Sequence, residues 1–301
     1  MLSPRHVGDF PPPPRQPPLI WLRPSHLAQR SLWLLLGLLI AFSLLSLRGL
    51  TLPPLLLPAL ALVTLLLVSA GVAFAQLGVF ARPLLAFTPT QPVLALTFDD
   101  GPHPQETPAI LKLLAAEGHT ATFFVIGEKA AQHPQILQEI HQAGHTLGHH
   151  SLRHVPWTPV LTAAQFEREV QETSRIFQRA GVKPPLWLRA PMGLITPPIE
   201  LAARRLGLEL VHWTATARDG VQRAQPERSL ARLQAHLRPG AILVLHDGVP
   251  GPQNSAGPQS SVARQILPQL LEKMRVQGLR SVGLDVLLAG ENGAAESKSA
   301  G

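Results

Sequence analysis

The sequence of 301 residues predicts an α/β domain, a distorted and incomplete (β/α) barrel with about seven parallel strands. A transmembrane helical hairpin is expected to precede it. Two observations carry this prediction. From about Pro92, short apolar segments alternate with amphipathic ones, as strands and covering helices do in a parallel sheet. Before that point, two long apolar segments carry no charge. Seven strands in about 200 residues suit an incomplete barrel better than an eightfold one.

The N-terminal segment carries most of the excess charge. The net charge is +7, and residues 1–90 contribute +5 of it, through six Arg and one Asp. Residues 1–30 are rich in Pro and are expected to form a disordered basic tail, and residues 290–301 a second disordered tail. No basic stripe with interleaved aromatic residues is visible, so we expect no nucleic-acid partner. The sequence implies no protein partner either.

Residues 31–81 are expected to form two transmembrane helices and to make the chain a multi-pass cell-membrane protein. The apolar segment Ser31–Leu47 is about 26 Å long as a helix, and Leu55–Phe80 is longer. A signal peptide fits less well, because the first segment is too long and a second one follows it. A buried hairpin of a soluble protein also fits less well, because neither segment has a polar face.

A hairpin places the tail and the α/β domain, expected at residues 91–289, on one side of the bilayer. Four Arg precede the first apolar segment and one lies between the two. The positive-inside rule therefore favours the cytoplasm for both ends.

The elements of the domain follow in order along the chain. Strands are expected at Val93–Phe98, Thr122–Ile126, Thr146–His149, Leu186–Arg189, Leu208–Trp213, Ala241–His246 and Arg280–Val282. Helices are expected near Pro108–Glu117, Pro134–Ala143, Thr162–Ala180, Pro198–Leu206, Gln225–Leu237 and Ser260–Gln277. Thr107-Pro108 is typical of a helix start, and Gly118, Gly144, Gly181 and Gly207 each follow a predicted helix.

Reactive side chains gather where these strands end. Asp99 and Asp100 close the first strand before Gly101-Pro102, and His246 closes the sixth. His150, His154, Arg189 and Asp219 end or follow the strands between them. The carboxyl ends of parallel strands meet at one rim, so we expect these side chains to lie together.

Three of these side chains predict a metal site. His150 and His154 are four residues apart and would face the same way on a helical turn. With Asp100 they form a set of three ligands with open positions, as in catalytic sites. The chain has no Cys, and this donor set fits Zn²⁺, with Co²⁺, Fe²⁺ or Mn²⁺ possible. Non-haem iron oxygenases use the same set, but no marker of a cosubstrate pocket is visible.

The remaining side chains predict acid–base chemistry. Successive side chains of a strand point to opposite sides, so Asp99 is free to act as a general base beside the metal. Arg189 could hold Asp99 ionised through a bidentate pair. His246 is either a core residue or a general acid that Asp219 orients, and Val244 shares its face and could line an apolar pocket.

Five motifs in this order resemble those of the polysaccharide deacetylases, the NodB-homology domain of carbohydrate esterase family four. They are Thr97–Pro102, His150–His154, Arg189–Gly193, Trp213–Asp219 and Leu243–His246. The resemblance implies that Asp99 is the base and His246 the acid. It also implies that Asp100, His150 and His154 hold the metal. It further implies that Pro191 and Met192 line the groove, with the Met192 N–H binding the oxyanion.

The resemblance implies a membrane-anchored N-deacetylase of N-acetylhexosamine polymers, such as peptidoglycan of the cell wall or a chitin-like glycan. Such a polymer would place the domain outside the cytoplasm, whereas the positive-inside rule favours the cytoplasm. The alternatives are an O-acetyl esterase, a hydrolase of small N-acyl amides, and a non-catalytic glycan-binding membrane protein. Met192 and Gly220 stand where the family commonly has aromatic residues, which leaves the substrate open.

Overall fold

The computed structural model describes residues 20–22, 26–221, 224–248 and 261–286. Most of the first predicted tail and all of the second, residues 290–301, lie outside these ranges. Within the first tail, β1 (Ile20–Leu22) pairs antiparallel with β2 (Ala86–Thr88).

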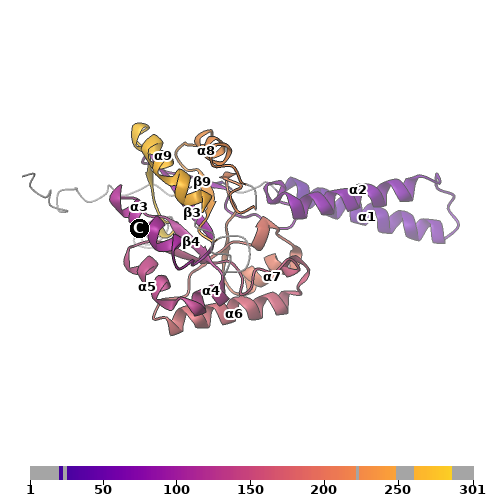
Figure 1. Cartoon of the computed structure of the whole chain (residues 1–301). Helices are drawn as coiled ribbons and strands as arrows, with labels where there is room; N and C mark the ends of the chain where they lie inside the picture. The colour runs from indigo at the N-terminus through magenta and orange to yellow at the C-terminus, as the bar shows by residue number, and fades with distance from the viewer. Residues whose placement is uncertain (1–19, 23–25, 222–223, 249–260, 287–301) are drawn as a thin grey trace, which may run out of the picture.

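Two apolar helices extend from the domain as a hairpin (Figure 1). They are α1 (Leu27–Leu47) and α2 (Leu56–Ala73), so α1 begins four residues before the predicted start and α2 ends well before Phe80. Only 6% and 11% of their most apolar windows are buried, and both helices are long and apolar enough to cross a membrane. The hairpin therefore is not a buried part of the domain core, and its helices are candidate membrane spans.

A curled sheet of parallel strands forms the domain, which confirms the predicted incomplete barrel. Its strand order is β7-β6-β5-β4-β3-β9-β8, and β10 pairs with the beginning of β3. The strands are β3 (Val93–Gly101), β4 (Thr122–Val125), β5 (Thr146–His149), β6 (Trp187–Leu188), β7 (Glu209–Leu210), β8 (Ala215–Thr216), β9 (Ile242–His246) and β10 (Arg280–Ser281).

Helices surround the sheet (Figure 1). They are α3 (Glu106–Ala116), α4 (Gly127–Gln132), α5 (Pro134–Gln142), α6 (Ala163–Arg179), α7 (Pro197–Arg205), α8 (Pro226–Gln234) and α9 (Val262–Val276). The four helix ends predicted from glycines are confirmed. Thr162 caps α6 through a capping box with Gln165, and the four glycines after helices have φ between 66° and 77°.

The register of neighbouring strands brings the reactive residues at the strand ends to one rim of the barrel, as expected. Asp99 on β3 lies opposite His246 on β9 and Phe124 on β4, and His149 on β5 lies opposite Leu188 on β6. Since the pairs are parallel, the residues that follow these strands share one edge of the sheet.

Three local expectations were wrong. Strand β3 does not stop at Phe98 but continues through both carboxylates to Gly101. Helix α3 begins at Glu106, so Thr107 lies inside the helix and does not cap it. The segment from His150 to His154 is an irregular loop without a helical turn, with φ of 65° at Ser151 and 51° at His154.

Several short elements were also not predicted from the sequence. Helix α4 and strand β8 were not predicted, and neither was β2, which lies before the expected start of the domain. Leu84 and Phe87 pack in one buried cluster with Phe124, Trp187 and Ile242 of the barrel interior.

Gly148 on β5 leaves no room for a side chain in the barrel interior. A Cβ there would overlap the ring of Phe124, which lies beneath the rim. We predict that Gly148→Ala lowers the free energy of unfolding by about 1–3 kcal/mol through overpacking. Thermal unfolding of the full chain in detergent measures this.

Gly118→Ala is the control for Gly148→Ala. A Cβ at Gly118 meets nothing within 4 Å, and its φ of 68° makes the cost about 1 kcal/mol. A Gly148→Ala protein that unfolds with the wild type would contradict the packing argument.

Candidate active site

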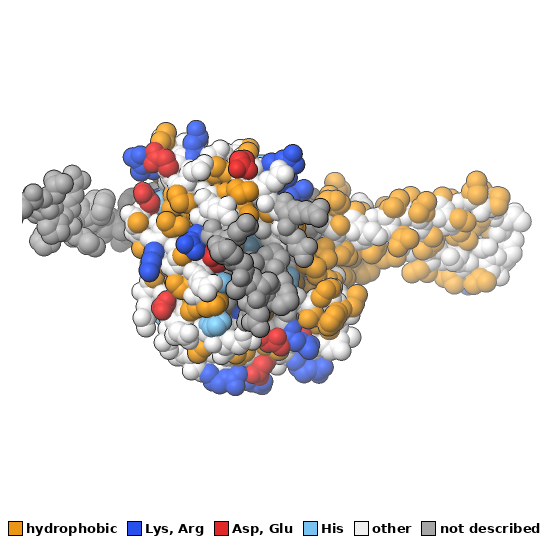
Figure 2. Space-filling view, in the orientation of Figure 1, with side chains coloured by type: hydrophobic (Ala, Val, Ile, Leu, Met, Phe, Trp, Pro, Cys, Tyr) orange, Lys and Arg blue, Asp and Glu red, His pale blue; other side chains and the backbone are white. Residues whose placement is uncertain are grey.

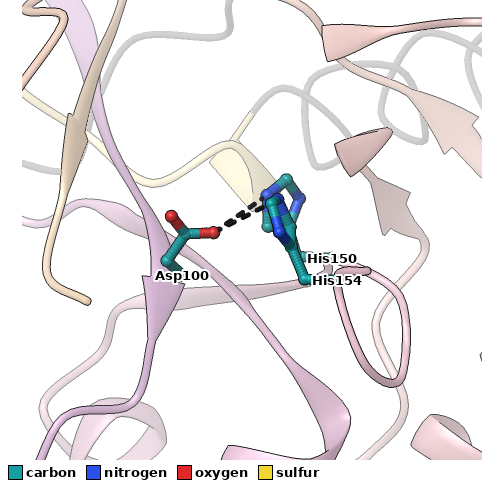
Figure 3. Close-up of side chains that lie close together, drawn as sticks. All are labelled: Asp100, His150 and His154. Carbon is teal, nitrogen blue, oxygen red and sulfur yellow. Dashed lines mark ion pairs between the residues drawn. The ribbon is translucent and has the colours of Figure 1, made fainter. Parts of the chain in front are cut away.

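Asp100, His150 and His154 converge at the rim (Figure 3). Asp100 Oδ1 lies 3.4 Å from His150 Nε2 and 3.4 Å from His154 Nε2, and one ligand atom from each residue lies within 4.8 Å of the others. Asp100 Oδ1 is buried and has no hydrogen-bond partner among the described residues.

This geometry fits a metal ion. Ligand atoms about 2.0–2.1 Å from a tetrahedral Zn²⁺ are about 3.3 Å apart, close to the two carboxylate–imidazole distances. A buried carboxylate oxygen without a donor is also the group that a cation would satisfy. Burial alone would raise the pKa of Asp100, but the nearby imidazoles, His150 first and then His154, lower the pKa overall. The ionised form needed for metal binding is favoured.

A backbone irregularity aims the two adjacent aspartates apart. Asp100 has φ of 72°, and the β3–β4 register shifts between Asp99 and Gly101. A Cβ at Gly101 would overlap the carboxylate of Asp247, so this position accepts only glycine without rearrangement. The separation of Asp99 from Asp100 therefore comes from a bulge, and not from the simple alternation of a regular strand.

Three residues that were not predicted as part of the site surround the bulge. The Asp247 side chain is buried and accepts a hydrogen bond from Thr107 Oγ1, and the Asp247 N–H donates to Asp99 O at 3.1 Å. Lys129 Nζ donates to Asp100 O at 2.7 Å. Burial raises the pKa of Asp247 to about 7. The position of Asp247 next to His246 was its only signal in the sequence.

The two histidines are oriented by the loop that carries them. His150 Nδ1 lies 2.9 Å from the carbonyl oxygen of Arg189, so that nitrogen carries the proton and Nε2 faces Asp100 with its lone pair. The backbone N–H of His154 donates to Ser151 Oγ at 2.9 Å. A loop with two left-handed residues thus brings the two imidazoles to the same side, as a helical turn was expected to do.

Arg189 holds Asp99 through a buried ion pair. Its Nη1 donates to Asp99 Oδ1 at 2.7 Å and to Thr97 Oγ1 at 2.8 Å, and its Nη2 donates to His212 O at 2.9 Å. The pair is therefore a single hydrogen bond and not the expected bidentate one. The guanidinium also lies 4.1 Å from the centre of the Phe124 ring. Burial lowers the pKa of Arg189, and the charge of Asp99 opposes that effect.

His246 and Asp219 form a second pair across the rim. Asp219 Oδ1 lies 2.8 Å from His246 Nδ1, and Asp219 Oδ2 accepts from the His246 backbone N–H at 3.0 Å. Burial alone would lower the pKa of His246, but the hydrogen bond and charge of Asp219 raise the pKa to about 9. The imidazole is therefore a cation at neutral pH, with Nε2 left for another partner.

The predicted groove residues lie on β9 and on the turn after β6. Pro191 and Met192 belong to a short 3-10 turn, η3 (Pro191–Gly193), in which Met192 has φ of 57° and an exposed side chain. Among the described residues, the Met192 N–H has no protein acceptor. Val244 is buried and lies beside Thr97 in the sheet.

The chain resembles known deacetylases in sequence. The family model for polysaccharide deacetylase matches residues 87–211. A chitooligosaccharide deacetylase from Bradyrhizobium sp. (strain ANU 289) is 37% identical over 156 residues, which cover 52% of this chain and 70% of that protein. A peptidoglycan-N-acetylglucosamine deacetylase from Bacillus cereus is 30% identical over 198 residues, which cover 65% of this chain and 88% of that protein.

The fold agrees with the sequence comparison. The family 4 carbohydrate esterase from Streptomyces lividans, solved in complex with acetate, aligns with a TM-score of 0.55 and 26% identity, over 63% of this chain and 91% of that chain. Sequence and fold thus lead to the same assignment, and the chain belongs to the polysaccharide deacetylase family, carbohydrate esterase family four, as a hydrolase of carbon–nitrogen bonds other than peptide bonds.

Proposed function

We propose that the protein is a membrane-anchored, metal-dependent deacetylase that removes acetyl groups from N-acetylhexosamine polymers. The observation that carries this proposal is the convergence of Asp100, His150 and His154 beside a separate, ion-paired Asp99. The names of the relatives, which act on chitooligosaccharides or peptidoglycan, support an N-acetylglucosamine substrate. The two apolar helices support the anchor. A cell-wall polymer requires the domain to lie outside the cytoplasm. The positive-inside rule, applied to the Arg residues beside the apolar segments, favours the cytoplasm instead.

Asp100, His150 and His154 would hold the metal, with Zn²⁺ as the proposed ion. When bound, it would polarise the acetyl carbonyl and lower the pKa of a water molecule. Asp99 takes the proton of the attacking water, and Arg189 holds that carboxylate in position through a hydrogen bond. The Met192 N–H donates to the oxyanion that develops on the former carbonyl oxygen.

His246 supplies the proton for the leaving group. Its Nε2 donates to the sugar nitrogen as the C–N bond breaks, while Asp219 holds Nδ1. Water and amide are converted to acetate and a free amine. Val244 and Pro191 are proposed to border the space for the acetyl methyl group.

The proposed reaction predicts metal-dependent release of acetate. We expect the full chain in detergent to release acetate from N-acetylglucosamine oligomers or peptidoglycan. Chelation should abolish the release and added Zn²⁺ should restore it, because the buried carboxylate oxygen and two imidazoles would be left without their ion. An enzymatic acetate assay measures this. Release from O-acetylated glycan alone would replace the amidase proposal with an esterase, and no release from any substrate would contradict both.

If Asp99 is the base, replacing it should reduce activity and leave metal binding unchanged. Asp99→Asn cannot accept a proton, so acetate release should fall by about 10²–10⁴-fold. One equivalent of Zn²⁺ should still bind, because the three ligands are unchanged. Equilibrium dialysis measures the metal and a thermal melt verifies folding. Wild-type activity in a folded Asp99→Asn protein would remove Asp99 from the mechanism.

The His246–Asp219 pair predicts how activity depends on pH. The acid must be protonated, so activity should fall as the pH rises through the His246 pKa, which Asp219 holds near 9. Asp219→Asn removes that charge, so the pKa should fall toward its ordinary value and the alkaline limb of the profile should move to lower pH. The control is Glu172→Gln, at an exposed carboxylate of α6. An unmoved alkaline limb in Asp219→Asn would mean that another group supplies the proton.

A further inference from the structure

An apolar surface lies on the catalytic domain next to the hairpin. Trp157 and Val160 belong to the loop around the short turn η2 (Thr158–Val160), and their side chains are 56% and 81% exposed. Within the described part of the catalytic domain, no large hydrophobic side chain is more exposed than Val160. This exposure costs free energy in water unless a partner or a lipid surface covers the two side chains.

One buried apolar cluster links the η2 loop to the base of the hairpin. Leu161 follows Val160 directly and packs, with Ala163, against a buried cluster that contains Ala75 and Ala81. These two alanines belong to the chain that leaves α2, so the end of the η2 loop and the hairpin base share one apolar cluster. Figure 2 shows hydrophobic side chains on the hairpin and on the adjoining surface of the domain.

Polar groups mark the level at which the hairpin joins the domain. His26, just before α1, lies 2.9 Å from Arg82 Nη1, and both residues line a cavity of about 330 Å³ together with Glu200, Arg204 and Glu209 of the domain. If α1 and α2 span a bilayer, these polar residues lie at the depth of the lipid headgroups. Trp is a typical residue of that depth, since its ring is apolar and its N–H is polar.

We propose that Trp157 and Val160 contact the lipid bilayer beside the hairpin, so that the rim of the active site rests at the membrane surface. The bilayer is the occupant favoured by the surface because it would already surround the adjoining helices. This inference depends on the membrane anchor of the proposed function and adds the orientation of the domain.

This orientation of the domain narrows the class of glycan that can reach the site. Trp157 follows the proposed metal ligand His154 by three residues, so their Cα atoms are at most about 11 Å apart. A rim held this close to the bilayer favours glycan that is attached to lipid or lies against the membrane, and disfavours strands far from the surface.

The absence of cysteine makes a direct test possible. Val63→Cys, Val160→Cys and Val276→Cys each introduce a single thiol at an exposed valine: one on the hairpin, one on the proposed contact and one on α9. Each full chain is labelled with a nitrobenzoxadiazole fluorophore and reconstituted in phosphatidylcholine vesicles with or without doxyl spin-labelled phosphatidylcholine. We expect the labels at positions 63 and 160 to lose most of their fluorescence to the spin label, and the label at 276 to keep it.

The three positions separate the possible failures. If position 63 is unquenched, the hairpin does not insert, and the anchor of the proposed function fails together with this inference. If position 63 is quenched and position 160 is not, only the contact is wrong. Blue-shifted emission without quenching at position 160 would mean that protein, such as a second copy of the chain, covers the surface, and would overturn the inference. Equal quenching at positions 160 and 276 would also overturn it. Trp157→Ser should reduce the quenching at position 160.

Discussion

The buried guanidinium of Arg189 connects the parts of the site. Its nitrogen atoms bind Asp99 and Thr97 on β3 and the backbone of His212 after β7, and its ring neighbour Phe124 lies on β4. Its own carbonyl oxygen fixes the His150 ring. The proposed base Asp99 and one proposed metal ligand, His150, are thus positioned by one residue. Removing it would leave the carboxylate of Asp99 buried and unpaired, which typically costs about 3–5 kcal/mol.

The second constraint is that two adjacent carboxylates must meet different partners. A regular strand would point Asp99 and Asp100 to opposite faces of the sheet, and one of them would then leave the rim. The bulge at Asp100 keeps both at the rim, with Asp99 toward Arg189 and Asp100 toward the histidines. Asp247 fills the space beside Gly101 that a side chain would otherwise occupy. The Asp-Asp-Gly sequence is therefore needed for shape as well as for charge.

The sequence predicted those features that depend on periodicity and on residue type. The alternation of strands and helices predicted a parallel sheet, and the rule that strand ends share a rim brought Asp99, His150, Arg189 and His246 together. Backbone irregularities were not predictable in the same way. Asp100, Ser151 and His154 are left-handed, a conformation that is uncommon outside glycine and that no local sequence pattern marks here. The Asp247–Thr107 contact joins residues 140 positions apart and leaves no local pattern.

Rigidity is distributed unequally between the centre of the site and its rim. Arg189, Asp99 and His150 are buried and fixed by hydrogen bonds, which suits groups that must be preorganised for proton transfer and metal binding. Met192, Trp157 and Val221 carry exposed apolar side chains, each within three residues of a site residue. The centre therefore determines the reaction, because its geometry cannot adapt. The rim carries the exposed apolar surface, which in the proposed function is available to a sugar face and, beside the hairpin, to lipid.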